Sequence, residues 1–163
     1  MKLITIIYKS LVWLRNYLFD VNIFPSYRSS IPVISIGNIT VGGTGKTPFV
    51  IYISNFLKEK SITPLIITRG YKRSSRKQIH ITENSTHRLS DIGDEAALIH
   101  SSCKGVDILV NKNRVKAVRW VEKNFLKYDC IILDDGFQHR SLKRDCNIVL
   151  INPGQNMSSY PPK

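Results

Sequence analysis

A glycine-rich segment that ends in a lysine and a threonine is the part of the chain best suited to chemistry. It spans residues 37–48, with Gly-Lys-Thr at 45–47. An apolar run at 32–36 precedes it and a helix-like run at 47–59 follows it, which is the strand–loop–helix order of a phosphate-binding loop. Backbone N–H groups in such a loop turn toward phosphate oxygens, and the helix N-terminus adds partial positive charge. The segment therefore predicts a site for a nucleoside triphosphate.

The roles within this loop follow from side-chain chemistry. Lys46 would contact the outer phosphates as a point charge, and the hydroxyl of Thr47 would bind Mg²⁺. The generic motif opens with glycine where this chain has Thr40, and a glycine-rich turn without a ligand is the alternative. The expected nucleotide-binding residues are Thr40, Val41, Gly42, Gly43, Thr44, Gly45, Lys46 and Thr47.

Two neighbouring aspartates, Asp134 and Asp135, follow a second apolar run at 129–133. An apolar strand that ends in acid is how a P-loop protein places a carboxylate near the Mg²⁺ that Thr47 also contacts. A helix or turn cap is the alternative. Neighbouring residues on a strand point to opposite faces, so the sequence leaves open which aspartate lies nearer the metal. ATP and Mg²⁺ are the cofactors expected.

Three further polar segments carry candidates. Asp94 stands where a helix N-cap belongs, and its functional alternative is a general base that takes a proton from an attacking hydroxyl. Loops at 69–73 and 136–140 follow strand-like runs, at the sheet edge where ligands bind in open α/β folds. Solvated charge and a structural histidine are the plain alternatives. The candidates for substrate contact or a supporting role are Arg69, Tyr71, Glu95, Gln138 and His139.

The remaining pattern is an alternation of strands and helices. Continuous apolar strands separated by helices favour a P-loop NTPase-like α/β fold, a parallel sheet with helices on both faces. Residues 69–92 are polar and basic and predict an extended loop or a small hairpin. The expected strands are 32–36, 64–68, 106–110, 129–133 and 146–151, and the expected helices are 47–59, 93–102 and 113–127.

Residues 1–19 predict an amphipathic helix, with Lys2 and Lys9 on a narrow polar stripe and aromatic residues on its flanks. The segment is too short and too charged for a membrane span. It could lie in a membrane interface or pack on its own domain. The net charge of +12 over 163 residues indicates anionic partners. We expect a connector at 20–31 and one catalytic core at 32–163.

The cysteines and histidines give no metal-binding pattern. The three cysteines, Cys103, Cys130 and Cys146, form no Cys-x-x-Cys pair, which favours reduced structural thiols in the cytosol. The four histidines lack zinc-ligand spacing with them. Nucleic-acid binding is not expected, because only the charge favours it and no motif supports it.

Together these motifs resemble the tetraacyldisaccharide 4′-kinase family of lipid A biosynthesis, through stretches 33–48, 68–72, 92–95 and 133–140. The resemblance implies a P-loop kinase that transfers the γ-phosphate of ATP to the 4′-hydroxyl of a tetraacylated glucosamine disaccharide 1-phosphate. It implies Asp94 as the catalytic base beside Lys46, with Thr47, Asp134 and Asp135 at the magnesium site.

The same resemblance implies a phosphorylated glycolipid substrate and an anionic membrane surface as partners. It places the protein peripherally on the cytoplasmic face of the inner membrane, with help from the helix at 1–19. Family members are longer and have a second domain that supplies a histidine to pair with the base, so we expect this chain to be an amino-terminal portion. A P-loop ATPase that docks on membranes as a binding switch is the alternative function.

Overall fold

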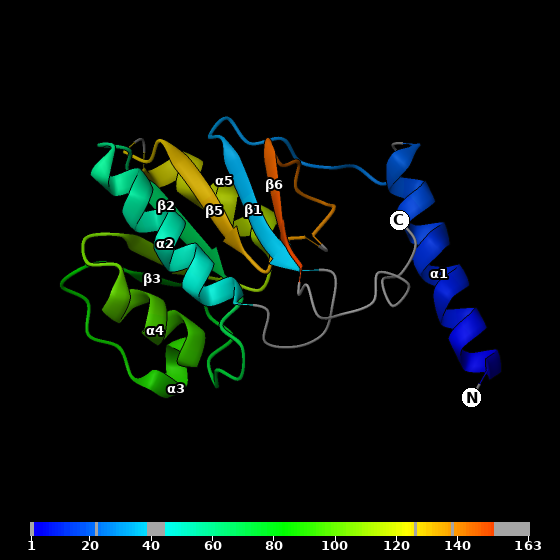
Figure 1. The fold of residues 1–163 in the computed structure, drawn as a ribbon, viewed down its shortest axis with the longest axis horizontal. Helices are drawn as coiled ribbons and strands as arrows, with labels where there is room; N and C mark the ends of the chain where they lie inside the picture. The colour runs from blue at the N-terminus through cyan, green and yellow to red at the C-terminus, as the bar shows by residue number, and fades with distance from the viewer. Residues whose placement is uncertain (1, 22, 39–44, 126, 138, 152–163) are drawn as a thin grey trace.

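The sheet is the centre of the fold. A computed structural model describes residues 2–21, 23–38, 45–125, 127–137 and 139–151. Six strands form one sheet in the order β3-β4-β2-β5-β1-β6 (Figure 1). All neighbouring pairs are parallel except β3 with β4. The strands are β1 (Val33–Asn38), β2 (Pro64–Thr68), β3 (Ile79–Ile81), β4 (Asp107–Val110), β5 (Cys130–Asp134) and β6 (Cys146–Leu150).

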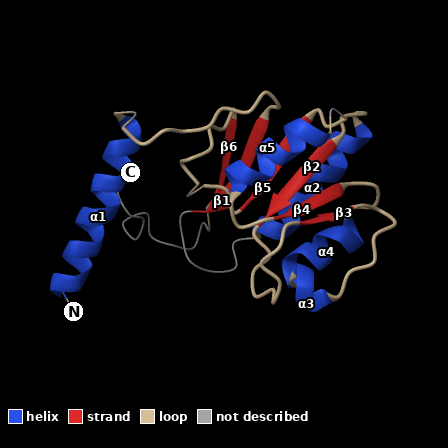
Figure 2. Cartoon of the chain, turned by 180° about the vertical axis from the view of Figure 1, so that it is seen from behind, coloured by secondary structure: helices blue, strands red, loops and turns tan. Residues whose placement is uncertain are grey.

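Helices cover both faces of this sheet, as Figures 1 and 2 show from opposite sides. Helices α2 and α4 lie on one face and α5 lies on the other. The helices are α1 (Lys2–Asp20), α2 (Lys46–Glu59), α3 (Leu89–Ile92), α4 (Asp94–Ser102) and α5 (Arg114–Asn124). The predicted α/β architecture is confirmed, with one antiparallel strand added at the edge.

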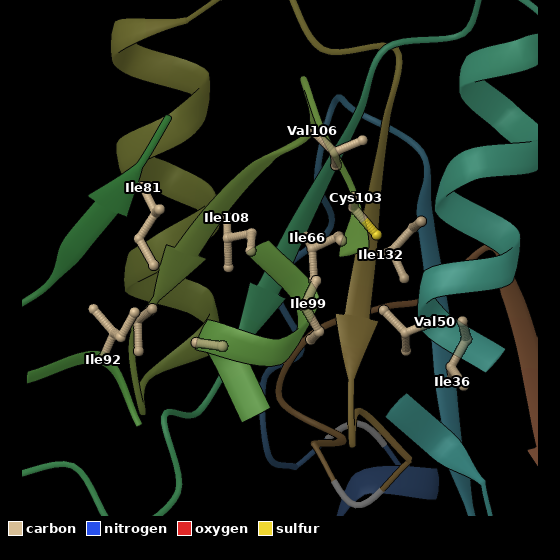
Figure 3. Packing of buried hydrophobic residues seen from close by; sticks show 12 residues of the cluster. Ile36, Val50, Ile66, Ile81, Ile92, Ile99, Cys103, Val106, Ile108 and Ile132 are labelled. Atoms are coloured by element: carbon tan, nitrogen blue, oxygen red, sulfur yellow. The ribbon is translucent and has the colours of Figure 1, made fainter. Parts of the chain in front are cut away.

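Alternation along the strands divides the core into two layers, because successive strand residues face opposite sides. Ile36, Ile66 and Ile132 face α2 and α4, where Val50 and Ile99 pack against them (Figure 3). The other layer faces α5. Its members from the strands and helix are Val33, Leu65, Ile67, Leu109, Ile131, Leu133, Ala117, Val118 and Val121. Both faces of the central strands are therefore buried, as their continuous apolar sequences indicate.

Two predictions about the elements need correction. The polar stretch 69–92 contains a short strand, β3, and a short helix, α3. Strand β3 pairs with β4, so the stretch is not a hairpin by itself. Helix α5 ends at Asn124 instead of residue 127, since Phe125 takes an extended backbone and packs into the apolar layer beside the sheet.

Helix α1 stands apart from the sheet, on the side of β6 (Figures 1 and 2). Its described apolar side chains are largely exposed, among them Leu11, Trp13, Leu14 and Tyr17. Trp13 and Tyr17 stack with ring centroids 5.6 Å apart. Within the described residues, no helix has the length and apolar character needed to cross a membrane.

Candidate nucleotide-binding site

The predicted motifs meet at one edge of the sheet. Strands β1, β2, β4 and β5 are parallel, so their carboxyl ends lie side by side. Ile36 of β1 pairs in register with Asp134 of β5. The start of the glycine-rich loop is therefore adjacent to the acidic pair, which is the arrangement that a shared magnesium site requires.

Lys46 is the first residue of α2 and faces this edge. Gly45 precedes it at the N-cap with φ of 74°, a left-handed conformation that favours glycine. The Nζ atom of Lys46 donates to Oδ1 of Asn38 at 2.9 Å and lies 3.8 Å from Oδ1 of Asp135. Thr47 follows in the first helical turn, partly buried. The predicted phosphate-binding lysine thus stands between the ends of β1 and β5.

The rest of the glycine-rich loop lies outside the described residues. This applies to Thr40, Val41, Gly42, Gly43 and Thr44, and also to Gln138 in the loop after β5. Their expected contacts with nucleotide or substrate stay predictions.

The two aspartates have different environments. Asp134 ends β5, is buried and accepts a hydrogen bond from Oγ1 of Thr68 at 3.0 Å. Burial raises the pKa of the Asp134 carboxyl above its ordinary value, and the charge of Asp135 adds to the rise. Asp135 is exposed, with a left-handed φ of 52°. The chain turns at Asp135, so the two carboxylates are not on opposite faces of one strand as the sequence suggested.

Arg114 is a site residue that sequence reasoning missed. Its guanidinium donates to the backbone carbonyls of Asn111 at 2.6 Å and Asp134 at 3.0 Å. Its side chain is almost completely buried, and burial lowers its pKa to about 10. A buried arginine beneath two aspartates offsets their negative charge. The sequence feature that could have pointed to Arg114 is its position directly after Asn113, the N-cap of α5.

Asp94 and Glu95 differ from the sequence interpretation. Helix α4 begins at Asp94, and its N-cap is Gly93, so the capping alternative for Asp94 is wrong. Asp94 is exposed, whereas Glu95 is partly buried. Burial raises the pKa of the Glu95 carboxyl, and the charges of Asp134 and Asp135 raise it further. Glu95 is therefore within reach of the charge of the acidic pair, and Asp94 is the exposed residue beside it.

The loop after β2 reaches the same place through Gly93. A Cβ atom at Gly93 would lie 2.6 Å from the backbone oxygen of Tyr71, so the two segments are in close contact. Arg69 and Tyr71 are exposed in this loop. The predicted basic loop and the acidic start of α4 are therefore neighbours, although β3 and α3 lie between them in the sequence.

His139 lies in the loop after β5 and lines a cavity of about 560 Å³. Burial, with the charge of Arg114 adding to its effect, lowers the pKa of its imidazole to about 4. The sequence did not predict this cavity, because its walls come from three separate segments. They are Arg76, Gln78, Asn111, Lys112, Asn113, Arg114, Lys116, His139 and Ser141.

The donors at the site are oxygen atoms. In the described part of the chain, no three His, Cys, Asp or Glu side chains are grouped to hold a metal. Asp134, Asp135 and the hydroxyl of Thr47 nonetheless fit Mg²⁺, which uses one or two carboxylates together with substrate phosphates and water. The three cysteine thiols are free, and Cys103 and Cys130 are buried.

Nearly the whole chain matches one known family. The family model for tetraacyldisaccharide-1-P 4′-kinase matches residues 1–160. The chain belongs to this family. Its tetraacyldisaccharide 4′-kinase relatives include one from Chlorobaculum parvum, 40% identical over 91% of this chain, and one from Porphyromonas gingivalis, 43% identical over 85% of this chain.

The kinase family also supplies a solved structure with the same fold. LpxK from Aquifex aeolicus in complex with ATP matches with a TM-score of 0.81 and 36% identity, over 89% of this chain. The chain spans 42% of the Chlorobaculum parvum relative and 46% of the Aquifex aeolicus chain. It therefore corresponds to less than half the length of these tetraacyldisaccharide 4′-kinases.

Proposed function

We propose that this chain forms the nucleotide-binding part of a kinase that transfers the γ-phosphate of ATP to the 4′-hydroxyl of a tetraacyldisaccharide 1-phosphate. The observation that carries the proposal is the position of Lys46, 2.9 Å from Asn38 and 3.8 Å from Asp135 at the carboxyl edge of the sheet. A family relative of the same fold binds ATP. The glycine-rich loop residues 40–47 would surround the phosphates.

Mg²⁺ would be held by Thr47 together with Asp134 and Asp135, where it would neutralise charge on the phosphates. Asp134 is already fixed by Thr68, so its carboxylate is held in one orientation. Burial is the main cause of the raised pKa values of Asp134 and Glu95, and the charges of neighbouring carboxylates add to it. A divalent cation bound there would favour the ionised carboxylates.

Asp94 would act as the general base toward the acceptor hydroxyl. It lies at the exposed N-terminus of α4, where an incoming substrate has access to its carboxylate. Glu95 would keep the metal side of the site acidic, and Gly93 would hold both residues against the loop at Tyr71. Lys46 would stabilise the charge that develops on the transferred phosphoryl group.

The cavity beside His139 is suited to the phosphorylated sugar. Its walls include Arg76, Lys112 and Lys116, and cationic side chains bind phosphate by charge-assisted hydrogen bonds. Arg69 and Tyr71 would lie beside the path by which the phosphorylated sugar enters the site. The substrate class of the proposal, a phosphorylated glycolipid, matches this charge.

Helix α1 would dock on an anionic membrane surface, with the protein peripheral on the cytoplasmic face of the inner membrane. Exposed Trp13 and Tyr17 have the amphipathic rings that favour the interface. The net charge of +12 adds attraction to anionic lipid. A nucleic-acid partner is not proposed.

The experiment that tests the kinase is transfer of labelled γ-phosphate from Mg-ATP to the tetraacyldisaccharide 1-phosphate in detergent micelles. This chain is assayed alone and joined to the second half of a family relative. In the active form, Asp94→Asn should abolish transfer and leave ATP affinity unchanged, whereas the nearby Asp91→Asn should retain transfer. The kinase proposal is wrong if the joined protein binds ATP without transferring phosphate.

The alternative is an ATPase switch that docks on membranes. It shares the lysine, the metal ligands and α1, but it needs no base on the acceptor side. Hydrolysis stimulated by anionic vesicles and unaffected by Asp94→Asn would favour the switch.

A further inference from the structure

Arg140 connects helix α1 to the loop that follows β5. Its guanidinium forms an ion pair with Asp20, the last residue of α1. The Cζ atom of Arg140 also lies 5.7 Å from the ring centroid of Phe19, and Arg15 lies over the same ring at 5.6 Å. The end of α1 is therefore attached to this loop by charge and by cation–π contact.

The connector that follows α1 reinforces this attachment. The hydroxyl of Ser26 donates a hydrogen bond to the backbone carbonyl of Arg140 at 2.7 Å. Tyr27 forms a parallel β-bridge with Leu142. The Tyr27 hydroxyl in turn donates to Glu122 of α5 at 2.5 Å. The connector is thus fixed to the core, and Arg140 is a point at which the helix itself contacts the loop.

The same loop leads from Arg140 back to the acidic pair through a short hydrogen-bonded segment. His139 N–H donates to the carbonyl of Gly136 at 3.0 Å, and Gly136 N–H donates to Ile36 of β1 at 3.1 Å. Arg144 donates to the carbonyl of Phe137 at 2.7 Å. These hydrogen bonds join Gly136 to His139, the neighbour of Arg140, and tie Gly136 to β1. Arg140 is therefore separated from the backbone beside Asp135 by one short, hydrogen-bonded segment.

Helix α1 and the loop also interact electrostatically, through Arg15 and His139. The charge of Arg15 in α1 contributes to the lowered pKa of His139, after burial and closer charges. Helix α1 and the loop after β5 are therefore joined by the ion pair and the cation–π contact of Arg140, and the charge of Arg15 is a minor addition.

We propose that Arg140 is a positioning residue, which couples the orientation of α1 to the loop that bears Asp135 and thereby sets the affinity for Mg-ATP. The coupling rests on the proposed function in one respect, that nucleotide binds beside Lys46. Docking of α1 on lipid would then change nucleotide affinity without any contact between lipid and nucleotide.

Charge reversal at the two partners tests the coupling. The variants are Asp20→Arg, Arg140→Asp and the double reversal, with Arg28→Asp as the matched control. Arg28 makes an exposed ion pair with Asp145 at 4.0 Å, and neither residue belongs to α1 or to the loop at 135–142. The measurements are Mg-ATP affinity with a fluorescent ATP analogue and amide hydrogen exchange across residues 15–20 and 135–142.

Each single reversal should weaken nucleotide binding by roughly twofold to fivefold, the range that an exposed ion pair supports, and the double reversal should restore it. Exchange should rise in both segments in each single variant and fall again in the double variant. The added positive charge of Asp20→Arg would by itself tighten binding of an anion, so weakening by that variant separates coupling from bulk charge.

The coupling is overturned if the double reversal fails to restore affinity, if Arg28→Asp weakens binding equally, or if no variant changes it. If the unaltered chain binds no nucleotide, the proposed function fails instead. Hydrogen exchange still decides in that case, because unchanged exchange of 135–142 in Asp20→Arg contradicts a link between α1 and the loop.

Discussion

The Nζ atom of Lys46 lies 3.8 Å from Oδ1 of Asp135. The two residues come from the start of α2 and the turn after β5, which meet because β1 and β5 are paired. Asn38, the last residue of β1, accepts a hydrogen bond from the same ammonium group. The lysine is thus held at the edge of the sheet by one neutral and one acidic side chain before any phosphate contact is considered.

Replacing Lys46 by alanine should weaken Mg-ATP binding by about tenfold to a hundredfold, because hydrogen bonds to charged groups contribute about 1.5–3 kcal/mol. Isothermal titration with a non-hydrolysable ATP analogue measures the effect. Lys58→Ala is the control, since Lys58 lies in the last turn of the same helix, with its ammonium bonded to the carbonyl of Lys104. Equal affinities for the two variants would place the phosphates elsewhere.

The stability of the protein should depend on pH through His139. Its pKa is lowered from 6.5 to about 4 in the folded chain. Between these two values the unfolded chain binds a proton that the folded chain does not, so the free energy of unfolding falls as pH decreases from 6.5 toward 4. Because His139 binds at most one proton, it changes the free energy of unfolding by at most about 1.4 kcal/mol per pH unit.

Urea unfolding of the wild type and His139→Gln at several pH values isolates this contribution. The variant should show a weaker fall in stability between pH 6.5 and pH 4. His87→Gln, at an exposed position, serves as the control and should follow the wild type. Identical profiles for the His139 variant and the wild type would contradict the prediction.

Gly93→Ala should destabilise the chain and disturb the site. Gly93 has φ of 86° and ψ of 158°, a region that only glycine occupies readily and that costs other residues about 1–3 kcal/mol. A Cβ atom there would also lie 2.6 Å from the backbone oxygen of Tyr71. Each kcal/mol lowers Tm by roughly 2–4 °C at this size.

Gly105→Ala is the matched comparison for thermal unfolding. Gly105 also has a left-handed φ, of 71°, but its Cβ would meet the flexible end of Lys58. The Gly105 variant should therefore lose less stability than the Gly93 variant. The reverse order would show that the contact with Tyr71 relaxes easily.

Trp13→Ala should reduce binding to anionic phospholipid vesicles by roughly threefold to tenfold, because the exposed indole contributes apolar area to an interfacial helix. Vesicle sedimentation measures the bound fraction. Tyr52→Ala is the control, since Tyr52 is 62% exposed on α2 and Trp13 is 63% exposed on α1. Equal losses for both variants would mean that α1 has no special part in docking.

Local sequence predicted the elements well where periodicity was strong. The apolar runs at 64–68 and 129–133 became β2 and β5 within one residue, because continuous apolar strands have few alternatives in a covered sheet. Strand β3 was missed because Ile79–Ile81 is short and contains His80. Its conformation depends on pairing with β4, a long-range contact that no local pattern encodes.

The candidate site was predictable in its residue types but not in its contacts. The lysine, threonine and paired aspartates were predicted as site residues because each belongs to a motif with a known role, and their roles stay predictions. Arg114 was not recognised, since an arginine at a helix start is normally solvated, and here it is buried against the carbonyl of Asp134. The assignment of Asp94 as a possible N-cap failed because Gly93 takes that position under constraint from Tyr71.

The sequence by itself determined which chemical groups are present, their order along the chain and the family to which the chain belongs. Tertiary structure decided which groups meet: Asp134 is buried against Thr68, Asp135 turns toward Lys46, and Arg140 binds the end of α1. The physical reason is that backbone preference and hydrophobic periodicity are local properties. Proximity between distant segments depends on strand order and packing, which are properties of the whole chain.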